Sequence, residues 1–366
     1  MSVTAVDVQY ARPRGPVSKH TLVVGDGVIG LSIAAELARR GAKVTVVGRE
    51  QQGAASWASG GLLAPSTGPL PEAVREFFMA SLRAYPAFVA ALRAHDPGLA
   101  VTSGLIELAD ERRLIDGAAA AVAHSVTRDE LARLEPSLPW RAGALLHPED
   151  GAVDARRLLA ALRREAETSP AIDIRLGAPA TRLELAGGRP TVVTSTGDRL
   201  AADTIVLAAG AWAAQLGGLP RSLPVAPLKG QMIALDGSPL RHPVLSGHTY
   251  LVPRGDVTIV GSTSEDVGFQ WNTDDATVAT LARAAQETVP ILAGARVVDR
   301  WAGVRPMTPD RMPIIGPDPD VQGLIYACGH SRNGILLAPA TARAVAHLAM
   351  QIVPDQNLGP FAVTRF

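Results

Sequence analysis

Cysteine, lysine and aromatic residues are scarce in this chain of 366 residues. Its one cysteine, Cys328, excludes an internal disulfide and favours a reducing compartment. The 8 histidines are scattered, with no Cys or His cluster at metal-ligand spacing, so we predict no metal. A formal net charge of +0 gives no electrostatic reason to bind nucleic acid or a membrane surface. The composition therefore argues against disulfide-stabilised, metal-dependent and nucleic-acid-binding classes.

Long hydrophobic runs are also absent. Residues 1–18 lack the apolar core of a secretory signal, so we expect a short disordered leader. The longest apolar stretch, residues 204–219, contains Gln215 and several glycines, and it is too short to span a bilayer. We therefore expect a cytoplasmic protein that crosses no membrane. The oligomeric state stays open, a homo-oligomer included.

A glycine-rich turn near the start of the chain is the most informative feature. Strand, helix and strand patterns follow one another over residues 21–24, 31–40 and 43–47. Between the first strand and the helix lies G-x-G-x-x-G, made by Gly25, Gly27 and Gly30. These glycines permit a tight turn, approach of backbone to a pyrophosphate, and close packing of helix on strand. Framed in this way, the motif predicts a dinucleotide-binding unit rather than a turn without a ligand.

The rest of the chain alternates between helix and strand patterns. Helical spacing covers residues 71–95 with an interruption at Pro86, 154–167 with Asp154 as the N-cap, 274–288 and 338–350. Strand patterns cover residues 103–108, 173–176, 190–195, 203–208, 231–235, 250–253, 257–261 and 323–328. The later strands alternate as in an antiparallel sheet with one solvated face.

These patterns predict an α/β fold in which a discontinuous Rossmann-type nucleotide-binding domain carries an inserted, β-rich antiparallel substrate domain. The nucleotide-binding parts are residues 19–95, 146–223 and 302–352. The substrate domain is expected at 96–145 and 224–301, with a C-terminal tail at 353–366.

Several motifs, in this order, resemble those of one enzyme family. They are ASGGLLAP at residues 58–65, PVAPLKGQM at 224–232, WAGVRPMTPD at 301–310 and GHSRNGILLAP at 329–339. Together they are similar to the flavin-dependent amine oxidases of the D-amino-acid oxidase superfamily, and most closely to its glycine oxidases. The likeness runs from about residue 20 to residue 350.

The resemblance implies a cofactor and a reaction. FAD would be bound non-covalently, since Cys328 does not fall where some relatives attach flavin. Glycine or another small amine or amino acid would be oxidised to its imine by hydride transfer to flavin, without a general base. Dioxygen would be reduced to hydrogen peroxide, and the imine would supply thiamine thiazole synthesis. An oxidase or dehydrogenase of a larger amine or D-amino acid, and a catalytically silent flavin-binding protein, stay as alternatives.

The substrate contacts are also implied by the resemblance. Arg305, expected in a loop after the β-rich lobe, would hold the carboxylate with two parallel hydrogen bonds. Tyr250 and His248 would lie in the same pocket, and Arg332 at the start of the last helix would face the flavin. The alternative for each is a structural or solvated role, which is the usual one for arginine and for a tyrosine on a strand.

Glycine-rich segments and helix starts dominate the predicted FAD contacts. These are Gly25, Gly27, Val28, Ile29, Gly30, Gly48, Arg49, Glu50, Ser56, Ser59, Gly60, Gly61, Leu62, Ala180, Ala209, Gly210, Trp212, Arg305, Gly329, His330, Arg332, Asn333, Gly334 and Ile335.

The chain departs from the dinucleotide pattern at the end of the second strand. An Asp or Glu usually stands there to bond the adenosine ribose, but this chain has Gly48, followed by Arg49 and Glu50. Either Glu50 reaches the ribose, or backbone and water do so, and we favour the second. Asp26 inside the glycine turn is also unusual, because it brings negative charge near the pyrophosphate.

Overall fold

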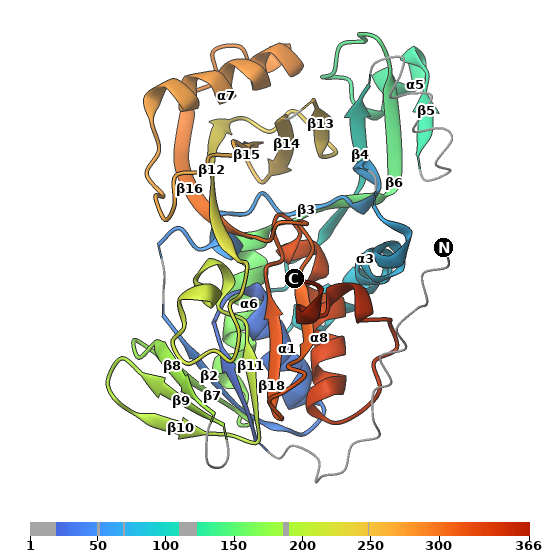
Figure 1. Cartoon of the computed structure of the whole chain (residues 1–366). Coiled ribbons are helices and arrows are strands. Elements are labelled where there is room, and N and C mark those ends of the chain that lie inside the picture. The colour runs from blue at the N-terminus through green and yellow to red at the C-terminus, as the bar shows by residue number, and fades with distance from the viewer. Residues whose placement is uncertain (1–19, 50–51, 69, 110–122, 186–189, 248) are drawn as a thin grey trace, which may run out of the picture.

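The computed structural model describes residues 20–49, 52–68, 70–109, 123–185, 190–247 and 249–366. The expected leader and the predicted site residues Glu50 and His248 lie outside this part of the chain. Figure 1 shows two stacked lobes. The nucleotide lobe contains helices α1 (Val28–Arg39) and α8 (Gly334–Ala349), and the substrate lobe contains the long strands β12 (Ala226–Asp236) and β16 (Val297–Met307).

A six-stranded sheet forms the centre of the nucleotide lobe, in the order β17-β18-β11-β1-β2-β7. Its strands are β1 (His20–Val24), β2 (Lys43–Gly48), β7 (Ile172–Leu176), β11 (Thr204–Leu207), β17 (Ile314–Pro317) and β18 (Leu324–Cys328). Neighbours pair in parallel except β17, which runs antiparallel to β18. Valine, isoleucine and leucine fill these strands because both faces of the sheet are covered.

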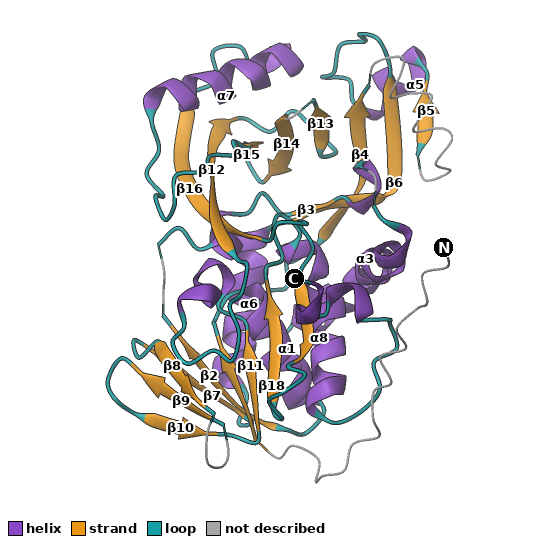
Figure 2. Ribbon diagram, viewed as in Figure 1, coloured by secondary structure: helices purple, strands orange, loops and turns teal. Residues whose placement is uncertain are grey.

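Alternate residues of β1 face two different cores. Val23 packs on the helical side, where α1 and α8 are joined by α3 (Glu72–Leu92) and α6 (Ala155–Thr168). Leu22 and Val24 pack on the other side, against a three-stranded sheet and the turn η2 (Gly210–Gln215). That smaller sheet contains β8 (Ala180–Glu184), β9 (Thr191–Thr194) and β10 (Arg199–Ala201). Figure 2 shows helices and small sheet on opposite sides of the parallel strands.

A larger sheet forms the substrate lobe, in the order β16-β12-β15-β14-β13-β4-β6-β3, with β5 paired to β6. Its other strands are β3 (Leu62–Leu63), β4 (Val101–Leu108), β5 (His124–Val126), β6 (Ala144–Val153), β13 (Val244–Ser246), β14 (Thr249–Arg254) and β15 (Val257–Gly261). Most pairs are antiparallel, as predicted, but β13 and β4 are parallel. One face packs on α7 (Asp275–Thr288) and α5 (Arg128–Leu134), and the other packs on α2 (Ala55–Ala58).

Most predicted elements are confirmed within a few residues, including the Asp154 cap, whose carboxylate accepts from the N–H groups of Arg156 and Arg157. The helix predicted to break at Pro86 is continuous as α3, because Pro86 lies on its exposed face. There the carbonyl left without an N–H partner can bond water. The last helix begins at Gly334, four residues before the predicted start at residue 338.

Two predicted boundaries fall inside strands. The limit at 145/146 lies within β6 and the limit at 301/302 lies within β16, and both strands belong to the substrate sheet. In β6 the apolar alternation is broken by His147, Glu149 and Asp150, which hides the strand from pattern analysis. The segment expected as a tail forms the turns η4 (Gly359–Phe361) and η5 (Val363–Arg365) with Phe361 buried.

None of the helices in the described ranges combines the length and the hydropathy that a bilayer crossing requires.

Candidate active site

A cleft of about 2530 Å³ lies where the two lobes meet, and it is lined by the β1–α1 turn, α2, η2, β16 and the loop before α8. Ligand pockets usually measure roughly 300–1,000 Å³. This cleft therefore has room for a dinucleotide together with a small substrate.

Most of the predicted contacts line the cleft. They are Gly25, Gly27, Val28, Ile29, Gly48, Arg49, Ser56, Ser59, Gly60, Gly61, Leu62, Ala180, Ala209, Gly210, Trp212, Tyr250, Arg305, His330, Arg332, Asn333, Gly334 and Ile335. Gly30 and Gly329 lie behind this lining and serve packing. A Cβ at Gly30 would overlap the Gly25 carbonyl, and one at Gly329 would lie 2.6 Å from Thr308 Cγ2.

The glycine turn needs glycine for two separate reasons. Gly25 has φ +121°, a conformation that L side chains rarely adopt, and a Cβ there would overlap the Ala208 carbonyl. A Cβ at Gly30 would push α1 away from the turn. The turn thus holds the start of α1 tightly against β1 and β11, as the motif predicts.

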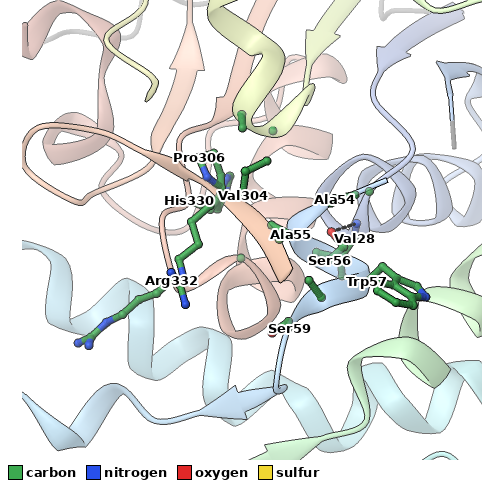
Figure 3. Close-up of a pocket in the computed structure, with 18 of the residues that line it drawn as sticks. Val28, Ala54, Ala55, Ser56, Trp57, Ser59, Val304, Pro306, His330 and Arg332 are labelled. Atoms are coloured by element: carbon green, nitrogen blue, oxygen red, sulfur yellow. Dashed lines mark hydrogen bonds between the residues drawn. The ribbon is translucent and has the colours of Figure 1, made fainter. Parts of the chain in front are cut away.

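The start of α1 is suited to an anion. Gly27 is its N-cap, no acidic residue occupies its first turn, and the N–H of Val28 donates to Ser56 Oγ at 3.0 Å. Figure 3 shows this bond, with Ser56 and Trp57 on the side of the pocket away from Arg332. Unpaired N–H groups and the positive end of the helix dipole favour phosphate at such a position.

A second glycine segment joins the two lobes. Gly61 has φ +82°, and a Cβ there would overlap the Val153 carbonyl of β6. A Cβ at Gly60 would lie 2.5 Å from Tyr250 Cε2. Because neither residue has a side chain, this segment packs closely against Tyr250 and β6 while it lines the cleft between the nucleotide turn and the substrate sheet.

The loop before α8 forms the wall opposite α2. His330 is buried, shares a hydrogen bond of 3.1 Å with Thr341, and burial lowers its pKa to about 3, so its ring is neutral. Ser331 has φ +52° and its N–H donates to the Pro306 carbonyl at 2.9 Å. Arg332 is exposed, and α8 begins two residues later at Gly334, with Asn333 as an N-cap that forms no side-chain cap bond.

These features fit FAD. One helix start offers N–H groups for the pyrophosphate, a side-chain-free surface lies at Gly60–Gly61, and a second uncapped helix start faces the same cleft. Cys328 also lines the cleft, but burial raises the pKa of its thiol to about 12.

Arg305 lies in the substrate lobe on strand β16, not in the loop predicted for it. Its Nη1 donates to the carbonyls of Lys229 at 3.3 Å and Thr263 at 3.0 Å, and its Nη2 donates to Ser262 Oγ at 2.6 Å. A Cβ at Gly230 would overlap the guanidinium, which therefore rests directly on β12. The side chain is fixed before any substrate arrives.

The charge of Arg305 has no carboxylate partner within ion-pair distance in the described ranges. Burial lowers the pKa of the Arg305 guanidinium, and the positive charge of Arg332 lowers it further, whereas Tyr250 raises it. The guanidinium is nevertheless protonated, as arginine always is in proteins. A half-buried, rigid and unpaired cation is a site for an anion, because an uncompensated charge away from water is costly.

Tyr250 lies beside Arg305. Its hydroxyl is 3.6 Å from Met232 Sδ, and burial raises its pKa, so the hydroxyl stays protonated and can donate. Ser262 Oγ accepts from Arg305 and lies close to the Tyr250 hydroxyl, so it stands between the two donors.

Sequence reasoning missed Ser262, Met232, Gly230 and Arg163 as cleft residues. The first three reach the site through strand register, since Gly261 pairs with both Met232 and Tyr250. Gly230 and Met232 lie in the segment 224–232 that carries the family resemblance, but no local motif marks Ser262 or Arg163 as cleft residues.

The fold and the cleft define a Rossmann-type dinucleotide-binding protein with a separate substrate lobe. The chain belongs to the DAO family of FAD dependent oxidoreductases, whose description matches residues 20–348.

Curated relatives match most of the chain. It is 35% identical to glycine oxidase of Pseudomonas putida over 94% of this chain and 98% of that protein. It is also 35% identical to the bifunctional protein ThiO/ThiG of Synechocystis over 94% of this chain, but spans only 53% of that protein. The chain thus spans about half the length of the bifunctional relatives it matches.

The structure is similar to the crystal structure of glycine oxidase from Geobacillus kaustophilus. The TM-score is 0.88 at 31% identity, covering 95% of this chain and 99% of that chain.

Proposed function

We propose that this chain oxidises glycine or another small amine or amino acid to its imine, using non-covalently bound FAD and reducing dioxygen to hydrogen peroxide. The rigid, unpaired Arg305 guanidinium at the substrate end of an FAD-sized cleft carries this proposal. The likeness to glycine oxidases supports the choice of substrate.

Arg305 and Tyr250 would bind and orient the substrate. Three of the five guanidinium N–H groups bond protein acceptors, which leaves two for the oxygens of a carboxylate. The Tyr250 hydroxyl supplies a further donor on the same side. His248 stays a predicted pocket residue.

Orientation is the main contribution that these residues make. A carboxylate held at two points leaves the amine and the α-carbon in one position, which removes orientational entropy from the reaction. When bound, FAD supplies the two-electron acceptor and passes the electrons to dioxygen. The N-terminus of α8 and Arg332 provide positive charge at the opposite wall of the cleft.

Non-covalent binding is supported by Cys328. The thiolate is the nucleophilic form of cysteine, and a pKa raised to about 12 keeps this buried thiol protonated. Acid precipitation should therefore release all the flavin into the supernatant, whereas flavin that stays with the precipitate would contradict this part.

A substrate panel tests the reaction. Purified holoprotein is mixed anaerobically with glycine, sarcosine, D-alanine or D-proline, flavin absorbance is followed, and peroxide is measured after oxygen is admitted. Glycine or sarcosine should bleach the flavin and give one peroxide per imine. A yellow protein that no amine reduces would overturn the proposal and favour the silent flavoprotein.

A larger substrate is the second candidate. The cleft lining includes the small side chain of Ser264, which leaves room for a substrate larger than glycine. Faster reduction of the flavin by D-alanine or D-proline than by glycine would favour a larger substrate.

The likeness to ThiO/ThiG supports a role in supplying the imine to thiamine thiazole synthesis. The single cysteine supports a cytoplasmic location.

A further inference from the structure

The missing acid at the end of β2 has a substitute in the structure. A Cβ built at Gly48 would lie 2.5 Å from both Cγ and Oδ1 of Asp26. The carboxylate of Asp26 therefore fills the space into which an acidic side chain at position 48 would extend. Gly48 stands where an acid is usual, and Asp26 places an acid inside the glycine turn. The absence of a side chain at Gly48 makes room for the carboxylate of Asp26, so one departure accounts for the other.

The position of the Asp26 carboxylate is fixed from two sides. Arg163 on α6 donates from Nη2 to Asp26 Oδ2 at 2.9 Å, and the backbone amide of Arg49 lies near the carboxylate on the other side. Asp26, Gly48 and Arg163 all line the cleft. An ionised carboxylate has about four acceptor positions, so these bonds leave capacity for a hydroxyl.

Arg163 also balances the charge. Negative charge beside a pyrophosphate is unfavourable, but the ion pair at 2.9 Å neutralises it while an oxygen of Asp26 still faces the cleft. Both side chains are largely buried, at 22% and 14% exposure, so solvent screens this pair only partly.

We propose that Asp26 accepts a hydrogen bond from a ribose hydroxyl of the adenosine part of FAD, in place of the acid that usually stands at the end of the second strand. Arg163 is the positioning residue that holds the carboxylate. Neither Glu50 nor water is then needed for this contact.

FAD affinity of the apoprotein, measured by flavin fluorescence, tests this contact without using activity. Asp26→Ala should weaken FAD binding roughly 10- to 100-fold, the range for a hydrogen bond to a charged group. The matched control is Asp173→Ala, which removes an exposed acid paired with Arg175 on the neighbouring strand β7 and should leave affinity unchanged.

Modified ligands separate a ribose contact from a general structural role. FAD analogues that lack the adenosine 2′- or 3′-hydroxyl should bind the unaltered protein roughly 10-fold more weakly for the hydroxyl that Asp26 accepts from. In Asp26→Ala the same analogue should bind as well as FAD, within about twofold. An equal loss in both proteins, or no loss in the unaltered protein, would overturn the proposal.

Moving the acid back provides a second route that does not depend on the folding of Asp26→Ala. Gly48→Glu alone should weaken FAD binding, because its Cβ overlaps the Asp26 carboxylate. The double variant Asp26→Gly with Gly48→Glu should recover both FAD affinity and sensitivity to the ribose hydroxyl. Recovery of affinity without that sensitivity would show that only the steric conflict had been relieved, and it would count against the proposal.

Discussion

The two lobes build their halves of the cleft by different means. In the nucleotide lobe much of the lining comes from short segments contiguous in sequence, such as residues 25–29, where glycine permits close approach of the backbone. In the substrate lobe the lining consists of side chains, and Tyr250, Ser262 and Arg305 come together because four strands, β14, β15, β12 and β16, pair in a particular register. A site built from backbone can be recognised in a short stretch of sequence. A site built from side chains on several strands depends on how the whole sheet pairs.

The lobes differ in what they bury as well. The parallel sheet is filled with aliphatic residues, while the substrate sheet encloses Glu107, His147 and Asp150, with His147 2.7 Å from Glu107 and 3.9 Å from Asp150. The substrate sheet thus holds a buried cluster of three ionisable side chains, whereas the strands of the parallel sheet are mainly aliphatic.

The substitution with the largest expected effect on stability is in the nucleotide lobe, where the backbone leaves no space for an added methyl group. Gly30→Ala places a methyl group on the Gly25 carbonyl, and neither atom belongs to a side chain that could move aside. We expect a loss of roughly 4 kcal/mol or more in the free energy of unfolding, together with loss of bound flavin. Urea unfolding and the flavin-to-protein ratio measure both.

Gly68→Ala is the control for that prediction, because its Cβ would meet only Arg332 Nη2, at an ordinary 3.9 Å. If Gly30→Ala were as stable as Gly68→Ala, the backbone account of the nucleotide lobe would be wrong.

Arg305→Ala should weaken substrate binding and leave cofactor binding unchanged. Loss of the carboxylate partner should cost about 2–4 kcal/mol in kcat/KM, or about 30- to 1000-fold, with flavin content unchanged. Arg305→Lys keeps the charge but not the planar fork, so its loss should be intermediate. Arg296→Ala, an exposed residue paired with Asp236, serves as the control in steady-state kinetics. An unchanged KM in Arg305→Ala would remove this residue from the site.

Asp150→Asn should stabilise the protein at neutral pH. Burial raises the pKa of Asp150 to about 6, above its ordinary value, so the native state binds the proton more tightly than the unfolded state. The contribution of Asp150 to stability therefore falls as pH rises from about 4 to about 6. At pH 7.5 the variant should be more stable by about 2 kcal/mol, and near pH 4 it should gain little.

Unfolding curves at the two pH values check the Asp150 prediction, with Glu76→Gln, at an exposed acid on α3, as control. A gain of the same size at both pH values would refute the link to proton binding.

The smallest effect concerns the outer edge of the substrate lobe. Thr127 caps α5, its hydroxyl accepting from the N–H of Glu130 at 3.3 Å. Thr127→Ala should lower the free energy of unfolding by about 1 kcal/mol, and Thr127→Ser by much less. Flavin affinity should not change, because Thr127 does not line the cleft. A change in affinity would mean that the outer edge is coupled to the cofactor site.

The elements that can be predicted from the sequence are those whose residue pattern lies within the element itself. The β1–α1–β2 unit and the Asp154 cap need only local spacing, and the structure confirms them. The motif around Arg305 makes it a candidate site residue, but Gly303 and Pro306 beside it are typical of a loop, so its place in strand β16 was not predicted.

The rest depends on contacts between distant segments. Polar residues interrupt β6, and its pairing with β3, β4 and β5 makes it a strand. Ser262 enters the site through the pairing of β15 with β14 and β12. The sequence shows Asp26 and Gly48 as two separate departures from the usual pattern. Only the coordinates show that the Asp26 carboxylate occupies the space that a side chain at Gly48 would fill.

The order of strands in the parallel sheet has a consequence for synthesis. The central strand β1 needs β11 on one side, β11 needs β18, and the far wall of the cleft is completed only by residues near 335. A nascent chain emerging from the ribosome therefore holds its phosphate-binding turn long before it has a flavin site, so cofactor loading must come at the end of translation or after it.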